Sequence, residues 1–148
     1  MNKGSAGNPA GAPVCQIATP ADRDAAIALW HACGLTRPWN DPVADFDFAL
    51  AGPDSTVLVL RGDTQLIGAA MVGHDGHRGG LYYLAIDPAR RGEGLGRLLL
   101  TECQNWLRAK SVPKLNLLVR KDNKSAIGFY EALGYTDQNC ISLGKPLD

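Results

Sequence analysis

Three glycines at alternate positions, Gly92, Gly94 and Gly96, separate an apolar run from an amphipathic segment. Glycine admits positive φ and lets bare backbone N–H groups approach a ligand closely. A helix that begins directly after such a turn points unpaired N–H groups and the positive end of its dipole at one place. This pattern is typical of a site for a phosphate or pyrophosphate. The open alternative is a tight strand-to-helix turn that holds no ligand.

Two common glycine-loop motifs do not fit this segment. A dinucleotide fingerprint needs G-x-G-x-x-G, but Arg97 stands where the third glycine belongs. The apolar run before the glycines also lies in the middle of an expected meander, whereas the fingerprint opens a β–α–β unit. The G-x-x-x-x-G-K-[ST] string of a P-loop does not occur in the sequence. A phosphate-bearing ligand of another kind is therefore expected.

The elements that must position this turn follow an α+β order, with a mixed sheet covered by helices. Asp41-Pro42 and Asn123 are helix-start signals, and glycines follow the expected helix ends. The helix after the glycines carries an apolar stripe at helical spacing, formed by Leu95, Leu98, Leu99, Cys103, Trp106 and Leu107. Strands are expected at residues 14–18, 55–60, 65–72, 81–86, 115–119 and 135–143, with helices beginning near residues 20, 41, 95 and 123.

Composition narrows the classes of protein to which this chain can belong. The chain has 148 residues, enough for one domain, and its 15 basic and 15 acidic residues give no net field that would recruit nucleic acid or an anionic membrane. Its four cysteines show no C-x-x-C spacing, so free thiols in the cytoplasm are expected. No apolar run approaches the ~18 residues of a membrane span. Residues 1–13 are expected to be a disordered leader and residues 14–148 a single domain.

Two stretches of the sequence resemble the GCN5-related N-acetyltransferase (GNAT) superfamily. Arg91-x-x-Gly94-x-Gly96 matches the family's Q/R-x-x-G-x-G/A motif, after the fourth strand and at the start of the third helix. Asn123, followed by a helix that carries Tyr130 and ends in a Gly-aromatic pair, matches a second family element. The two motifs are independent and correctly spaced.

The resemblance extends over residues 16–147. Two short segments, 37–42 and 75–79, are similar to the YpeA-type subgroup of bacterial acetyltransferases. The resemblance implies the GNAT fold, with a mostly antiparallel sheet of six to seven strands, a splay between the fourth and fifth strands, and four flanking helices. It also makes a homodimer an open alternative to a monomer.

Acetyl-CoA is the co-substrate that the resemblance implies. Arg91 and Arg97 would add charge to a pyrophosphate site. The fourth strand would bind the pantetheine arm through its backbone, and one N–H would polarise the thioester carbonyl. The alternative is that residues 84–86 only form part of the sheet core and bind no ligand. The implied pyrophosphate and arm residues are Leu84, Ala85, Ile86, Arg91, Gly92, Glu93, Gly94, Leu95, Gly96 and Arg97.

Two residues near the C-terminus each have a second interpretation. By resemblance, Asn123 contacts the CoA arm and Tyr130 is the general acid that protonates the departing thiolate. A phenol suits that role, because its ordinary pKa near 10 keeps it protonated at neutral pH. On residue type alone, Asn123 would be only a helix cap and Tyr130 only a core tyrosine.

The general base is not identified by the resemblance, because residues 81–86 carry no carboxylate where many family members have a Glu. The candidates are Asp75, His74, His77, Asp41 or a water relay. A metal site at His74, Asp75 and His77 is disfavoured, because no further ligands accompany them.

Loop residues on either side of the expected sheet are candidates for acceptor recognition, since loops commonly carry binding groups. An arginine there would suit an acceptor with a carboxylate. The alternative is that Trp39 covers the core and Asp41 only starts a helix. The candidates are Arg37, Trp39, Asn40, Asp75, His77 and Arg78.

The sequence therefore predicts an N-acetyltransferase that moves acetyl from acetyl-CoA to a primary amine of a small molecule or protein, by direct attack in a ternary complex. The expected partners are this amine acceptor, with neither nucleic acid nor membrane, and no metal is expected. The alternative is a non-catalytic module that binds or senses acyl-CoA.

Overall fold

The computed structural model describes residues 12–147, so residues 1–11 of the expected leader lie outside the described residues. The chain separates into two compact units, Met1–Asn116 and Leu117–Asp148. No helix in the described part of the chain has both the length and the apolar character needed to cross a bilayer.

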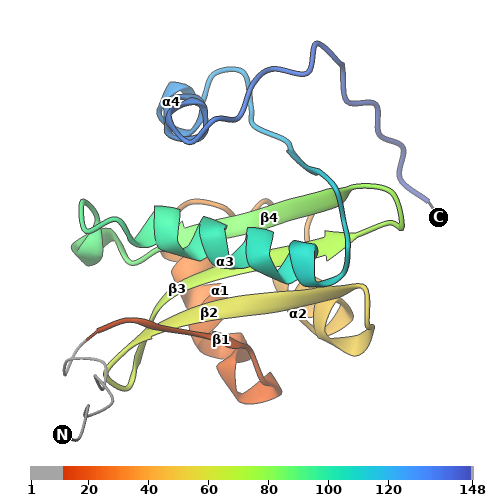
Figure 1. Cartoon of the computed structure of the whole chain (residues 1–148). Coiled ribbons are helices and arrows are strands. Elements are labelled where there is room, and N and C mark those ends of the chain that lie inside the picture. The colour runs from red at the N-terminus through yellow and green to blue at the C-terminus, as the bar shows by residue number, and fades with distance from the viewer. Residues whose placement is uncertain (1–11, 148) are drawn as a thin grey trace, which may run out of the picture. The chain divides into compact units, whose positions relative to one another are not determined.

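One five-stranded sheet organises the described residues, in the order β1-β2-β3-β4-β5. Its first four strands are labelled in Figure 1. The first four strands form an antiparallel meander, and β5 returns beside β4 in parallel after a helical crossover. The strands are β1 (Val14–Ile17), β2 (Ser55–Gly62), β3 (Gln65–His74), β4 (Gly79–Ile86) and β5 (Leu115–Leu117).

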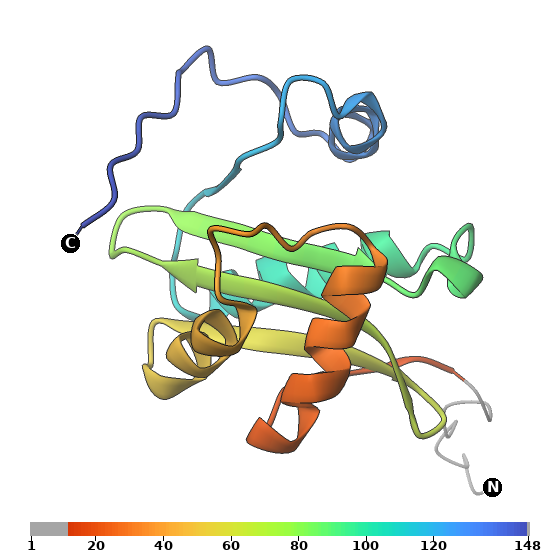
Figure 2. The same ribbon diagram turned by 180° about the vertical axis from the view of Figure 1, so that it is seen from behind.

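Helices cover both faces of the meander. In Figures 1 and 2, α1 (Arg23–Ala32) and α2 (Pro42–Ala51) lie on one face and α3 (Leu95–Ala109) lies on the other. This explains why Val57 to Leu60 on β2 form a continuous buried run rather than an alternating one. The fourth helix, α4 (Lys124–Ala132), belongs to the second unit.

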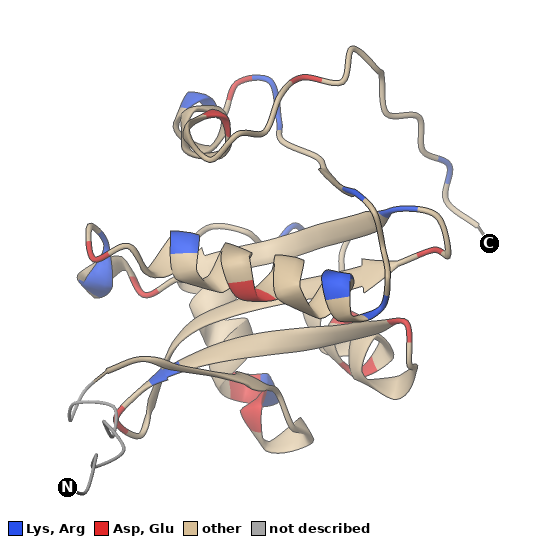
Figure 3. Ribbon diagram, in the orientation of Figure 1, with Lys and Arg blue, Asp and Glu red and all other residues tan. Residues whose placement is uncertain are grey.

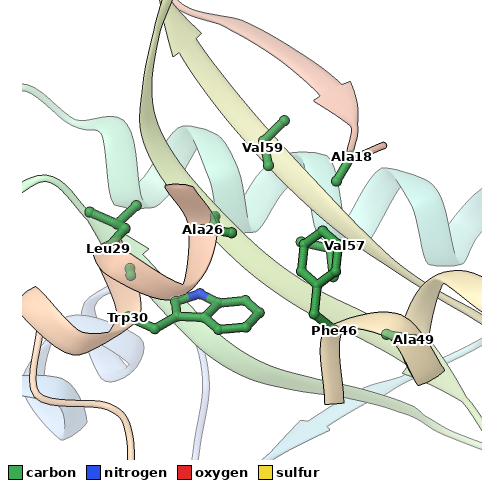
Figure 4. Packing of buried hydrophobic residues seen from close by; sticks show 10 residues of the cluster. Ala18, Ala26, Leu29, Trp30, Phe46, Ala49, Val57 and Val59 are labelled. Atoms are coloured by element: carbon green, nitrogen blue, oxygen red, sulfur yellow. The ribbon is translucent and has the colours of Figure 1, made fainter. Parts of the chain in front are cut away.

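The core on the α1 and α2 face is built around two aromatic side chains (Figure 4). Trp30 of α1 and Phe46 of α2 are fully buried, with ring centroids 6.2 Å apart. They pack over Val57 and Val59 of β2, and each large side chain buried in this way contributes ~1.5–3 kcal/mol to stability. The core therefore fixes both helices against the sheet.

The entry to α1 is tied to the sheet by a carboxylate. A short 3-10 turn, η1 (Pro20–Asp22), precedes α1, and the Thr19 N–H donates to Asp22 Oδ2 at 2.9 Å. Arg61 on β2 also donates to the Asp22 carboxylate. The expected helix start near residue 20 is confirmed, and the acid there also connects the helix to β2.

Two sequence predictions about strands are wrong. The described residues form five strands rather than six to seven, and residues 135–143 form no strand. Local bonds occupy that segment instead: the Asn139 N–H donates to Asp137 Oδ1 at 2.8 Å, and Asn139 takes a left-handed φ of 56°. Such side-chain turns compete with extended pairing. The fifth strand is also shorter than expected, ending at residue 117 rather than 119.

The predicted apolar stripe of α3 is correct except at one position. Leu95, Leu99 and Cys103 are buried as expected. Leu98, however, is 36% exposed, while Leu100, outside the predicted stripe, is 1% exposed. The helix is therefore rotated slightly about its axis relative to the predicted stripe.

Candidate functional site

The turn before α3 has the backbone form that glycine permits. Gly92 and Gly94 have positive φ values of 83° and 74°, where a side chain with a Cβ is strained. An added Cβ at either position would meet nothing within 4 Å in the described structure, so backbone conformation alone requires glycine there. Gly96 is the second residue of α3. The turn presents bare backbone to open space.

No side chain caps the start of α3, because its N-cap residue is Gly94. The first four N–H groups of a helix have no partner inside that helix. The aligned peptide dipoles of its 15 residues add a partial positive charge at the same end. The N–H groups of Leu95, Gly96 and Arg97 are arranged as an anion site requires.

A charge pair inside the turn neutralises its acid. Arg90 Nε donates to Glu93 Oε2 at 2.7 Å, and Arg90 Nη2 donates to Oε1 at 2.9 Å. These bonds lower the pKa of the Glu93 carboxyl and raise that of the Arg90 guanidinium. Figure 3 shows basic and acidic residues together at this turn. Because Arg90 compensates Glu93, the turn keeps the positive charges of Arg91 and Arg97.

A β-bulge interrupts β4 just before this turn. Pairing with β3 joins Ala69 to Ala85 and Met71 to Tyr82, so two residues of β4, Tyr83 and Leu84, stand opposite the one residue left on β3. A bulge disrupts the ladder locally and redirects the backbone. Of the three residues predicted to bind the pantetheine arm, Leu84 lies in the bulge, and Ala85 and Ile86 follow it in regular pairing.

Only part of β4 can pair with the strand on its other side. The Gly79 N–H, at the beginning of β4, donates to the carbonyl of Lys114 at 2.8 Å. The strand that follows, β5, has three residues against eight in β4, which is ~10 Å of pairing against ~26 Å. The later part of β4, with the bulge, therefore extends beyond this pairing.

Tyr83 in the bulge has an uncommon backbone conformation and unusually firm side-chain contacts. Its φ of 57° is left-handed, which costs a non-glycine residue ~1–3 kcal/mol. Its ring stacks on Trp30 with centroids 4.3 Å apart, and its hydroxyl donates to Asp45 Oδ2 at 2.7 Å. A stacked pair stabilises by ~0.5–1.5 kcal/mol and a hydrogen bond to a charged group by ~1.5–3 kcal/mol. The contacts are thus large enough to offset the strain.

Burial and the bond to Asp45 raise the pKa of the Tyr83 phenol to about 12. Tyr83 is therefore a neutral donor across the physiological range. It joins β4 to α1 through Trp30 and to α2 through Asp45.

The candidate acceptor residues Arg37, Trp39 and Asn40 lie in the connection between α1 and α2 (Figure 2). The Arg37 guanidinium donates to the carbonyls of Gly34 and Thr36, at 2.8 and 3.1 Å. Trp39 is 70% exposed, which contradicts the alternative that it covers the core.

The same connection runs from the end of β4 to the start of α2. The Cys33 thiol donates to the Ile86 carbonyl at 3.2 Å. At the other end, Asp41 caps α2, since its Oδ1 accepts from the N–H groups of Val43 and Ala44 at 3.1 Å each. The helix-cap interpretation of Asp41 is confirmed.

The other acceptor candidates lie in the turn between β3 and β4. The Asp75 Oδ1 accepts from the N–H groups of Arg78 and His77 at 2.8 Å each, and these bonds lower the pKa of the Asp75 carboxyl. Arg78 donates to the His77 carbonyl at 3.0 Å. These bonds of Arg78 and those of Arg37 stay within their own segments, and the two segments meet β4 at different ends.

The remaining base and metal candidates adjoin that turn. His74 lies 3.5 Å from Asp54 Oδ1 through its Nε2, and its Nδ1 accepts from the Gly76 N–H at 3.1 Å. Among residues 12–147, no group of three or more His, Cys, Asp or Glu side chains could hold a metal ion.

In the second unit, Asn123 and Tyr130 belong to one helix. Asn123 Oδ1 accepts from the Ala126 N–H at 3.1 Å, so Asn123 is the cap of α4. The Tyr130 ring meets Phe129 and Tyr135 edge-on, with centroids 5.0 and 5.6 Å away. The Tyr135 N–H donates to the Tyr130 carbonyl at 3.0 Å. The ring of Tyr130 is thus fixed within its own unit.

Sequence reasoning missed Arg90, Tyr83 and Asp45. The Arg90–Glu93 pair has a weak signal, since the two opposite charges are three residues apart within one predicted turn. Tyr83 and Asp45 are 38 residues apart, and nothing in a strand's alternation marks which residue will take a left-handed φ.

Comparison with known proteins supports one family. The model described as the "Acetyltransferase (GNAT) family" matches residues 24–135. An acetyltransferase of Pectobacterium atrosepticum is 43% identical over 126 residues, covering 85% of this chain and 89% of the relative.

Two solved structures have a similar fold. One is an aminoglycoside acetyltransferase from an uncultured soil metagenomic sample, solved with sisomicin, with a TM-score of 0.77 and 15% identity over 92% of this chain and 97% of the other. The second is a "predicted acetyltransferase with acetyl-CoA" from Clostridium acetobutylicum, with a TM-score of 0.73 and 17% identity over 89% of this chain and 96% of the other.

The family model and the curated relative both cover most of the chain. The chain belongs to the acetyltransferase (GNAT) family, and it is an acetyltransferase that uses acetyl-CoA as its co-substrate.

Proposed function

We propose that this enzyme transfers the acetyl group to a primary amine of a small molecule or protein, by direct attack in a ternary complex. The observation that carries the proposal is the continuous arrangement of the β4 bulge, the glycine turn and the uncapped start of α3. These features place redirected strand backbone and an anion site next to each other in the chain, as a thioester attached to a pyrophosphate requires.

In this proposal the donor is bound mainly by backbone. The N–H groups of residues 92–97 hold the pyrophosphate, with charge from Arg91 and Arg97. The backbone of residues 84–86 binds the pantetheine arm, and an N–H at the bulge polarises the thioester carbonyl. Asn123 contacts the arm, and Tyr130 protonates the departing thiolate.

Direct attack is supported by the state of two thiols. Burial raises the pKa of Cys103 to about 12 and that of Cys15 to about 11. A thiol acts as a nucleophile through its thiolate, so neither residue is suited to form an acyl-enzyme. These two thiols therefore give no support to a covalent acetyl-enzyme, which favours direct attack of the amine on the thioester.

The attacking ammonium must first lose a proton, and we assign this step to His77 or to water. Asp75 is the weakest candidate, because its two backbone hydrogen bonds lower its pKa. Asp41 is engaged as a helix cap. His77 is exposed in the turn between β3 and β4, and histidine is the most frequent general acid or base in enzymes.

A panel of amines tests the acceptor. Aminoglycosides belong in it because of the structural neighbour solved with sisomicin, beside peptides with free N-termini, lysine peptides and small diamines. We expect at least one class to release CoA thiol and to gain one acetyl group by mass spectrometry. Acetyl-CoA binding without acetylation of any amine would contradict the proposal.

The proposal also includes recognition of a carboxylate on the acceptor. Arg37 or Arg78 would bind an acceptor carboxylate, and an unchanged acceptor KM in both alanine variants would contradict this role.

We place the enzyme in the cytoplasm because its cysteines are free thiols. The family resemblance leaves a homodimer and a monomer as alternatives, and sedimentation at micromolar concentration distinguishes them.

A further inference from the structure

The strained residue in β4 is held from outside the strand. Tyr83 takes a left-handed φ of 57° between two stretches of regular pairing with β3. Trp30 on α1 stacks on its ring, and Asp45 on α2 accepts a hydrogen bond from its hydroxyl. We propose that Asp45 is a positioning residue that acts through Tyr83 to fix the β4 bulge in the register that directs backbone toward the acetyl-CoA thioester.

The pleat explains why the bulge needs such a contact. Side chains alternate between the two faces of a strand, so moving a bulge by one residue transfers neighbouring side chains to the other face. Tyr82, directly before the bulge, is 55% exposed. A bulge displaced by one residue would withdraw Tyr83 from Trp30 and Asp45. The two contacts therefore select one bulge position among neighbouring ones.

The position of Asp45 is fixed by the helix that carries it. It lies in α2, where its N–H donates to the Asp41 carbonyl at 2.9 Å. The next residue, Phe46, is fully buried against the sheet. Packing in the core thus fixes the position of α2 relative to β4. The hydrogen bond from Tyr83 to Asp45 then fixes Tyr83 relative to α2.

This inference rests on the proposed function, since the bulge matters only if it binds the thioester. Tyr83→Phe removes the hydroxyl and keeps the ring on Trp30, while Asp45→Asn weakens the same bond from the other side. We expect each to lower kcat about tenfold, a fraction of the ~10²–10³ lost with a whole oxyanion donor. The acetyl-CoA KM should change less than about twofold, because the glycine turn is untouched.

Two comparisons separate positioning from general damage. The double variant should be no slower than the slower single variant, because both changes remove one interaction. Asp47→Asn is the matched control: Asp47 also lies in α2, and its carboxylate accepts from Arg23 on α1 at 3.1 Å rather than from β4. We expect its kcat to equal that of the wild type.

Nuclear magnetic resonance measures the backbone conformation of the bulge and does not require catalytic activity. The HN–Hα coupling and the Cα and Cβ shifts of residue 83 report its φ, and we expect both site variants to depart from the wild-type values while Asp47→Asn retains them. Unchanged kcat in both variants, or lowered kcat with an unchanged residue-83 conformation, would overturn the inference. A wild type that acetylates no amine would refute the proposed function, and the spectra would still decide whether Asp45 fixes the conformation of the bulge.

Discussion

At the scale of single residues, catalysis in this account depends most on Tyr130. Tyr130→Phe removes the proposed proton donor and keeps the ring that packs against Phe129 and Tyr135. Because a general acid contributes ~10²–10⁴-fold, we expect kcat to fall at least about a hundredfold with little change in acetyl-CoA KM. Steady-state kinetics measures both. Tyr135→Phe, in the same aromatic group, is the control, and equal effects of the two variants would contradict the assignment.

A second prediction at this scale concerns the Arg90–Glu93 ion pair and the affinity for acetyl-CoA. Arg90→Ala leaves the Glu93 carboxylate uncompensated beside the proposed pyrophosphate site, so we expect the acetyl-CoA Kd to rise about fivefold at low salt. Adding Glu93→Gln should restore most of the affinity. Titration calorimetry at low salt measures the acetyl-CoA Kd of the wild type, Arg90→Ala and the double variant. An Arg90→Ala defect that Glu93→Gln does not relieve would show that the pair acts in another way.

At the scale of elements, the glycine turn is required for its backbone form. Gly94→Ala places a Cβ on a residue with φ of 74°, and we expect it to cost ~1–2 kcal/mol of stability and to raise the acetyl-CoA KM. Gly52 is the matched control, since it follows α2 with φ of −115° and has open space around an added Cβ. Thermal unfolding should show Gly52→Ala to be neutral or stabilising. Equal losses in both variants would contradict the conformational argument.

The bond between η1 and β2 predicts a pH dependence of stability. Burial opposes ionisation of Asp22, but hydrogen bonds from Arg61 and Thr19 outweigh it and lower the pKa of this carboxyl. A lowered folded-state pKa stabilises the fold above the unfolded value near 3.9 and loses that effect as pH falls through the folded value.

Asp22→Asn should therefore cost ~1.5–3 kcal/mol at pH 7 and progressively less below pH ~4. Urea unfolding of wild type and variant at several pH values measures this difference. The exposed Arg23–Asp47 pair provides the control, since such pairs contribute at most ~1 kcal/mol. A difference that stays constant down to pH ~2 would contradict the assignment.

The elements also show how far the sequence alone predicts this structure. Local chemistry determines the start of α2, where Asp41 and Pro42 act as cap and first residue, and the turn at Gly92 and Gly94. The bulge at Tyr83 could not be predicted, because it depends on contacts with Trp30 and Asp45 that form only on folding.

The strand expected at residues 135–143 does not form, because polar side chains of that segment make a local turn instead. The same limit applies at the site: the positive φ of the glycine turn, proposed to bind an anion, could be predicted from the sequence, and the residues that contact the bulge could not.

At the scale of the whole molecule, the first unit contains the β4 bulge, the glycine turn and the start of α3 that are proposed to bind the donor. Its meander carries helices on both faces, and the strand with the bulge leads directly into the glycine turn and α3. The proposed acid and the Asn123 contact belong to the second unit. The account therefore requires both units for catalysis, with donor binding carried mainly by the first.

The central claim is direct acetyl transfer from acetyl-CoA to an amine, and initial-rate kinetics tests it most directly. With the best amine from the panel, both substrates are varied while CoA thiol release is followed. We predict double-reciprocal lines that intersect, as a ternary complex requires. Parallel lines, which indicate a covalent acetyl-enzyme, or the absence of amine-dependent thiol release from an enzyme that binds acetyl-CoA, would contradict the account.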